Sequence, residues 1–241
     1  MQVIQGSASR LVGFIICWRV IGAGADMTVI APAILVYSKE ELKQRLASVP
    51  SAKTIHIDIM DGKFVNNTTI GPAELQDLPK DREIEYHLMV ADPLAFIEKL
   101  PGGKNSIFEV HLESVKAGQE KEIAEAVKKK KSRLAWVLNP PTPLARLESC
   151  LGSVSQILLM TVNPGWAGQS YIEEVEEKMR ELRKLRPGLS IEIDGGVGAK
   201  TIPRARAAGA DRFAAASSVF GHKEPDTAYR NLLSLANKRG E

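Results

Sequence analysis

Residues 54–60 read TIHIDIM, a short run in which apolar side chains alternate with a histidine and an aspartate. Short apolar runs bounded by turn-forming residues are typical of buried strands. Working outward from this run, seven more of the same kind occur, at residues 28–35, 84–90, 106–111, 134–139, 156–162, 190–194 and 212–216. We therefore predict eight β-strands.

Longer amphipathic runs separate the predicted strands. They predict helices at residues 39–47, 121–131, 143–150, 171–185, 200–208 and 225–237. Such alternation is typical of repeated βα units around a parallel sheet, and eight units close into a barrel. An open doubly wound sheet is the alternative, but no Gly-x-Gly-x-x-Gly motif follows the first predicted strand, where a dinucleotide-binding fold would place it. The predicted fold class is α/β, a single (β/α)₈ TIM barrel.

The chain length fits one such domain. A barrel of this kind has about 250 residues, and the chain has 241. We expect residues 27–241 to form the barrel. Residues 1–26 have no place in the βα pattern, so we expect an unstructured extension or a segment upstream of the true start. The apolar run at residues 11–17, which Arg10 precedes, leaves a targeting peptide as the alternative.

Composition argues against several classes of function. The net charge is +3, and the one dense basic run, residues 128–131, lies at the end of a predicted helix, so we expect no nucleic-acid binding. Cys17 and Cys150 lie far apart with no paired spacing, which favours a reduced, cytoplasmic protein over a disulfide framework. The N-terminal apolar run is too short to span a bilayer, so we expect no membrane association.

Four ionisable residues lie in the predicted strands. His56 and Asp58 are two residues apart and therefore share one face of a strand. His87 lies near the end of the third strand and Asp194 closes the seventh. A lone strand histidine is usually a hydrogen-bonded core residue, and a lone aspartate before Gly-Gly is usually a turn former. Four such groups together in a barrel mouth would be costly to bury without a metal or a substrate to match them.

Two imidazoles and two carboxylates suit one divalent metal ion, such as zinc, iron(II), manganese or cobalt. The reaction that fits this site is proton transfer at a carbon next to a carbonyl, with the metal as Lewis acid stabilising an enediolate. Asp58 and Asp194 come from separated strands and could stand on opposite faces of the planar intermediate. If one removed the proton and the other returned it on the far face, the result would be epimerisation.

Loops after the sixth to eighth strands are rich in small residues. Exposed backbone amides in such loops bind anions, and in barrels the loops after strands 7 and 8 often bind phosphate. Loop glycines are also common for turn geometry alone. The predicted phosphate site consists of Gly165, Gly168, Gly195, Gly196, Ser217 and Ser218.

Taken in order, the motifs resemble the ribulose-phosphate 3-epimerase family over residues 28–236. The matching segments are IAPAIL at 30–35, HIDIMDG at 56–62, IGP at 70–72, HLMV at 87–90, LNP at 138–140, VNPG at 162–165, IDGG at 193–196 and FG at 220–221. The resemblance implies interconversion of ribulose 5-phosphate and xylulose 5-phosphate in the pentose phosphate pathway. The expected partners are this small-molecule sugar phosphate and, in a homo-oligomer, further copies of the chain.

The resemblance also implies roles for individual residues. Residues matching His56, Asp58, His87 and Asp194 bind the metal, and Asp58 and Asp194 form the acid/base pair. Methionines matching Met60, Met89 and Met160 line the centre and shield the intermediate from water, although ordinary barrel packing explains them equally well.

Three positions depart from the family pattern. Ala33 stands where the family usually has serine, Ala216 where it has glycine, and Trp166-Ala167-Gly168-Gln169 where it has Phe-Gly-Gly-Gln. These changes surround the predicted site, so they bear on which substrate binds more than on which reaction takes place. An epimerase of a hexulose phosphate such as allulose 6-phosphate and a non-catalytic sugar-phosphate-binding barrel remain alternatives. Related decarboxylases and aldolases carry Asp-x-Lys-x-x-Asp on this strand, and this chain has no lysine there.

Overall fold

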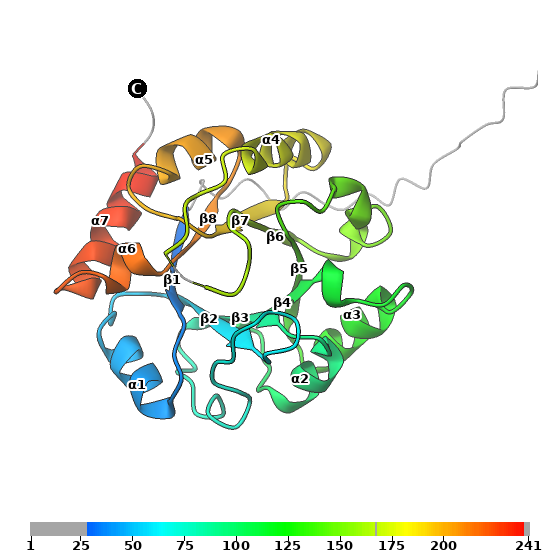
Figure 1. Ribbon diagram of the computed structural model, residues 1–241, viewed down its shortest axis with the longest axis horizontal. Coiled ribbons are helices and arrows are strands. Elements are labelled where there is room, and N and C mark those ends of the chain that lie inside the picture. Colours follow the sequence, from blue (N-terminus) through cyan, green and yellow to red (C-terminus); the bar gives the residue numbers. More distant parts are fainter. Residues whose placement is uncertain (1–27, 167, 239–241) are drawn as a thin grey trace, which may run out of the picture.

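Each of the eight predicted apolar runs forms a strand, and the ends differ from the prediction by at most two residues. A computed structural model describes residues 28–166 and 168–238. Its strands pair in parallel, in chain order, and β8 closes onto β1 (Figure 1). The predicted (β/α)₈ barrel is therefore confirmed. The strands are β1 Val29–Ile34, β2 Thr54–Met60, β3 Glu83–Met89, β4 Ser106–His111, β5 Arg133–Leu138, β6 Gln156–Met160, β7 Ser190–Asp194 and β8 Arg212–Ala215.

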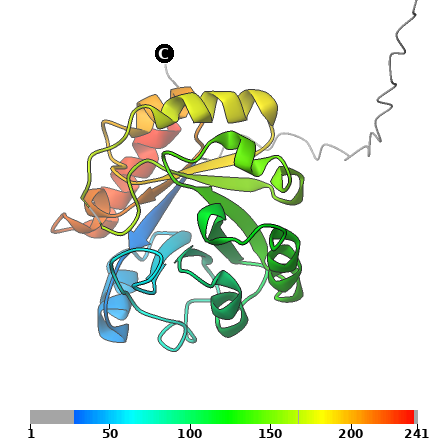
Figure 2. The same ribbon diagram turned by 45° about the vertical axis from the view of Figure 1, so that its right-hand side comes forward.

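Helices surround the ring of strands, as Figures 1 and 2 show from two directions. Ser38 begins α1 by accepting a hydrogen bond from the amide of Glu41, and Asp92 begins α2 by accepting one from Ala95. No helix in the described ranges is long and apolar enough to cross a membrane. The helices are α1 Lys39–Ala47, α2 Pro93–Lys99, α3 Glu120–Lys129, α4 Val175–Leu185, α5 Ile202–Ala208, α6 Ser217–Phe220 and α7 Pro225–Asn237, with 3₁₀ turns η1 Leu112–Ser114, η2 Leu144–Leu147 and η3 Leu151–Ser153.

Two helix predictions need correction. The helix expected at 143–150 is a 3₁₀ turn, because its amides bond three residues back, as from Arg146 to Pro143. The helix expected from residue 171 begins at Val175, since the amide of Ile172 instead bonds the carbonyl of Thr161. Helices α2 and α6 were not predicted, and both are short. The predicted extension 1–26, together with Cys17 and Ala167, lies outside the described residues.

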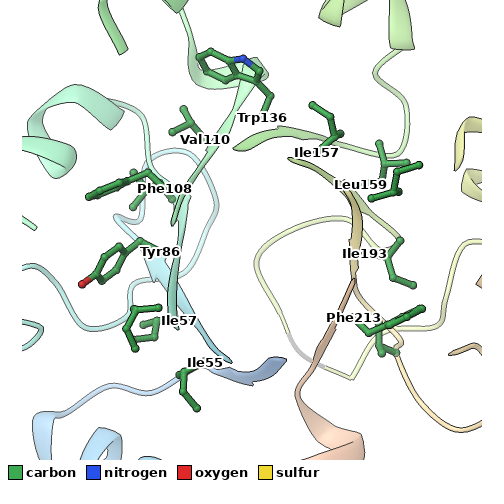
Figure 3. Packing of buried hydrophobic residues seen from close by; sticks show 14 of the residues in the cluster. Ile55, Ile57, Tyr86, Phe108, Val110, Trp136, Ile157, Leu159, Ile193 and Phe213 are labelled. Atoms are coloured by element: carbon green, nitrogen blue, oxygen red, sulfur yellow. The ribbon is translucent and has the colours of Figure 1, made fainter. Parts of the chain in front are cut away.

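The two faces of the strands differ in character. Side chains such as Ile55, Ile57, Tyr86 and Phe108 point away from the barrel axis and pack beneath the helices (Figure 3). Because side chains alternate along a strand, His56 and Asp58 point into the barrel. Barrel interiors are usually filled by Val, Ile and Leu, whereas this interior contains many buried polar groups. They are His56, Asp58, Glu85, His87, Glu109, His111, Gln156, Glu192 and Arg212.

Candidate active site

The structure brings together the four ionisable residues that the sequence singled out. Strand β2 positions His56 and Asp58, β3 positions His87, and β7 ends at Asp194. One ligand atom from each residue lies within 4.8 Å of the ligand atoms of the other three. Their convergence follows from the strand register, because Asp58 pairs directly with His87 across the β2–β3 ladder.

The distances are those of donor atoms that surround one point. His87 Nδ1 lies 3.0 Å from Asp58 Oδ1 and 3.6 Å from Asp194 Oδ2. His56 Nε2 lies 3.2 Å from His87 Nδ1 and 3.4 Å from Asp58 Oδ1. Both imidazoles are fully buried. Two nitrogen and two carboxylate oxygen donors in this arrangement fit a divalent transition metal ion.

The two aspartates differ in their affinity for a proton. Burial alone would raise the pKa of Asp58, but hydrogen bonds from His56 and His87 lower that pKa well below its usual value. Burial and the neighbouring charge of Asp58 raise the pKa of Asp194. Asp58 therefore keeps its negative charge more readily, and Asp194 keeps a proton more readily. Carboxylates whose pKa values are pushed apart in this way are typical of acid/base pairs.

His111 and Glu113 extend the site and were missed by the sequence reasoning. His87 Nε2 lies 2.8 Å from His111 Nε2, and His111 Nδ1 lies 3.4 Å from Glu113 Oε2. Burial lowers the pKa of His111 to about 4, so this ring is neutral near pH 7. If His87 offers the Nδ1 lone pair to the site, its Nε2–H donates to His111 Nε2, and the His111 proton then lies on Nδ1, on the side of Glu113. The sequence did contain a signal for His111. It is the last residue of β4, just as His87 lies near the end of β3, so both could have been expected at the same end of the barrel.

A pocket opens at this end of the barrel. Its floor includes Asp58 and Asp194 together with the three predicted methionines. None of its lining residues in the described chain is Lys or Arg, so backbone amides are the main donors that it offers to an anion. Its walls come from the loops after β6, β7 and β8 and include Gly165, Trp166, Gly168, Gly195, Gly196, Val197, Ala216 and Ser217.

The residues predicted to bind phosphate do not all face this pocket. Ser218 is not among the lining residues, and its hydroxyl donates to the carbonyl of Val197 at 2.7 Å. Gly195 and Gly196 have φ values of +116° and +62°. A Cβ atom on Gly195 would lie 2.4 Å from Val162 Cγ2. The chain therefore requires glycine at position 195 for close packing, whether or not a ligand binds.

The positions that depart from the family pattern have different surroundings. Ala33 is buried in β1 and pairs with His56 in the sheet. Ala216 lines the pocket just before α6, with a φ of −92° that any residue can adopt. Trp166 also lines the pocket and is 59% exposed.

Solved structures that resemble this chain support the fold. One is KGPDC from Streptococcus mutans, with a TM-score of 0.70 and 15% identity, covering 87% of this chain and 97% of the other. Another is 3-hexulose-6-phosphate synthase from Salmonella typhimurium, with a TM-score of 0.65 and 13% identity, covering 86% of this chain and 98% of the other. At such low identity the likeness shows the barrel alone.

Sequence comparison identifies the family. The chain is 41% identical over 179 residues to the cytoplasmic isoform of ribulose-phosphate 3-epimerase from Oryza sativa subsp. japonica, covering 72% of this chain and 78% of the relative. It is 34% identical over 207 residues to ribulose-phosphate 3-epimerase from Bacillus subtilis (strain 168), covering 82% and 94%. The profile of the Ribulose-phosphate 3 epimerase family matches residues 29–220. The chain therefore belongs to the ribulose-phosphate 3-epimerase family and is an isomerase of the class that epimerises carbohydrates.

Proposed function

We propose that this protein inverts C3 of D-ribulose 5-phosphate to give D-xylulose 5-phosphate, with Asp58 and Asp194 as the two proton-transferring groups. The observation that supports this most is the convergence of the two carboxylates with two imidazoles beside a pocket, in a member of this family. A cytoplasmic location and homo-oligomeric assembly stay predictions.

His56, Asp58, His87 and Asp194 would hold one divalent ion, namely zinc, iron(II), manganese or cobalt. When bound, the ion would polarise the ketone of the sugar and so acidify the neighbouring C3–H bond. An aspartate with a reference pKa of about 3.9 is a weak base for such a proton and needs this help. One carboxylate removes the C3 proton from one face, and the other delivers a proton to the opposite face. Asp58 is the more readily ionised of the two, so it can accept the C3 proton without first losing a proton of its own.

The surrounding residues orient the sugar and limit access of water. Met60, Met89 and Met160 are 3%, 2% and 1% exposed and place apolar side chains on the pocket floor. They would keep water from the planar intermediate. The phosphate would lie against the loops after β6 to β8, next to Ser217, the first residue of α6.

Removing the metal is expected to abolish the activity. Protein treated with a chelator should lose epimerisation, because neither carboxylate alone is basic enough to remove the C3 proton. Adding back zinc, iron(II), manganese or cobalt should restore it. The measurement is a coupled assay with ribulose 5-phosphate, with elemental analysis of the same sample. Full activity in demonstrably metal-free protein would contradict the assignment, and faster turnover of allulose 6-phosphate would identify a hexulose phosphate as the substrate instead.

Replacing Ala216 by glycine is expected to tighten phosphate binding. The methyl group of Ala216 lines the pocket where the phosphate would approach the backbone, and glycine permits a closer approach. Ala216→Gly should lower the KM for ribulose 5-phosphate with little change in kcat. The control is Ala215→Gly, the same change at a fully buried neighbour that does not line the pocket. An unchanged or raised KM for Ala216→Gly would mean that the loop already fits its ligand.

A further inference from the structure

A layer of buried polar side chains lies inside the barrel directly beneath the candidate active site. We call Glu85, Glu109, Gln156, Glu192 and Arg212 the inner layer. These residues belong to β3, β4, β6, β7 and β8, and all are at least nine-tenths buried. Three carboxylates are costly to bury, and the proposed function gives this layer no role.

Within the inner layer, one oxygen of each carboxylate contacts Arg212 or Gln156. Arg212 contacts Glu85 Oε1, and its Nε lies 3.4 Å from Glu192 Oε2. Gln156 donates from Nε2 to Glu109 Oε1 at 3.1 Å and to Glu192 Oε2 at 2.6 Å. Each of the three carboxylates therefore has its second oxygen free to face another group.

All three second oxygens face one atom, His56 Nδ1. The distances to this nitrogen are 3.2 Å from Glu109 Oε2, 3.5 Å from Glu85 Oε2 and 4.0 Å from Glu192 Oε1. None of these four atoms has a hydrogen-bond partner of good geometry within the described residues. Only the Glu109 distance falls within the usual range for an N–H···O bond, which ends near 3.2 Å.

We propose that Glu109 is a positioning residue for His56: it accepts the Nδ1–H bond and thereby leaves the Nε2 lone pair directed at the four-residue site. A neutral imidazole has one N–H, so anchoring the proton on Nδ1 selects the tautomer in which Nε2 is a ligand atom. Histidines that bind metals commonly donate the other ring N–H to a carboxylate, which fixes the ring and strengthens the ligand. The inference rests on the proposed metal site.

Two isosteric variants form a matched test. Glu109→Gln and Glu192→Gln make the same chemical change to fully buried residues that both accept from Gln156. Only Glu109 lies within hydrogen-bond distance of His56 Nδ1. Cobalt(II) affinity is measured by competition with a chelator, on protein whose folding is verified by circular dichroism. Glu109→Gln should weaken cobalt(II) binding by about 10- to 100-fold, and Glu192→Gln should leave it within experimental error.

A second measurement does not depend on either variant folding. In the zinc-loaded parent protein with ¹⁵N-labelled histidine, NMR should find the His56 proton on Nδ1. A proton on Nε2 of His56 would overturn the inference, as would equal losses of cobalt(II) affinity in the two variants or no loss in Glu109→Gln. If the parent bound two cobalt ions per chain and Glu109→Gln lost one of them, His56 Nδ1 and the three glutamate oxygens around it would instead form a second metal site. A parent protein that binds no divalent ion would refute the proposed metal site itself.

Discussion

The variants Asp58→Asn and Asp194→Asn are each expected to epimerise the substrate ~10²- to 10⁴-fold more slowly than the parent protein. This is the usual contribution of a general acid or base. Asparagine keeps nearly the same shape but cannot accept the proton. The two losses should differ in kind, because each variant keeps one base on one face of the sugar. Each should at most exchange the C3 proton of one epimer with deuterated solvent and return it to the same face, and the two variants should act on opposite epimers.

Proton NMR of both epimers in deuterium oxide measures this exchange. Both aspartates are also proposed metal ligands, so the metal content of each variant must be verified first. Asp211→Asn is a suitable control, since Asp211 pairs with Arg183 at the other end of the barrel. It should change stability without changing the pattern of exchange. Interconversion at near the parent rate in either active-site variant would show that its carboxylate is only structural.

His87→Ala is expected to lose most of the bound metal and, with it, most of the activity. His87 Nδ1 lies near both aspartates, at 3.0 Å from Asp58 and 3.6 Å from Asp194. Alanine would remove the nitrogen donor that stands between two carboxylates in a buried site, and mutual repulsion of the carboxylates would then favour their protonation.

Elemental analysis and the coupled assay on the same sample measure both effects. His222→Ala provides the control, because His222 is exposed in the turn after α6 and is not among the residues that line the active-site pocket. Unchanged metal content in His87→Ala would remove His87 from the proposed ligand set, even if the activity fell.

The sequence was sufficient to predict the barrel and the convergence of four ionisable residues. Both predictions rest on periodicity, because apolar strands alternate with amphipathic helices and His56 and Asp58 are spaced to share one face. The exact helices were harder to predict. Helix α2 has seven residues and α6 has four, too few for a helical period to stand out, and the 3₁₀ turn η2 contains only two spaced leucines, Leu144 and Leu147.

The buried glutamates of the inner layer were not predicted from the sequence. A glutamate in a strand is ordinarily expected on the solvent side, yet Glu85, Glu109 and Glu192 are completely buried. Each stands two residues before a residue of the site, namely His87, His111 and Asp194, so the same alternation that places His56 and Asp58 on one face could have placed the glutamates inside. Gln156 of β6 bonds Glu109 of β4, and Arg212 of β8 pairs with Glu85 of β3. These strands are not neighbours in the sheet, so both contacts follow only from closure of the barrel.

The most direct test of the proposed reaction is proton NMR of ribulose 5-phosphate incubated with the metal-loaded protein in deuterium oxide. Two-base transfer between Asp58 and Asp194 predicts that xylulose 5-phosphate forms with deuterium at C3, because the proton taken on one face is not the one delivered on the other. No conversion of ribulose 5-phosphate, or conversion that leaves the original proton at C3, would contradict this account.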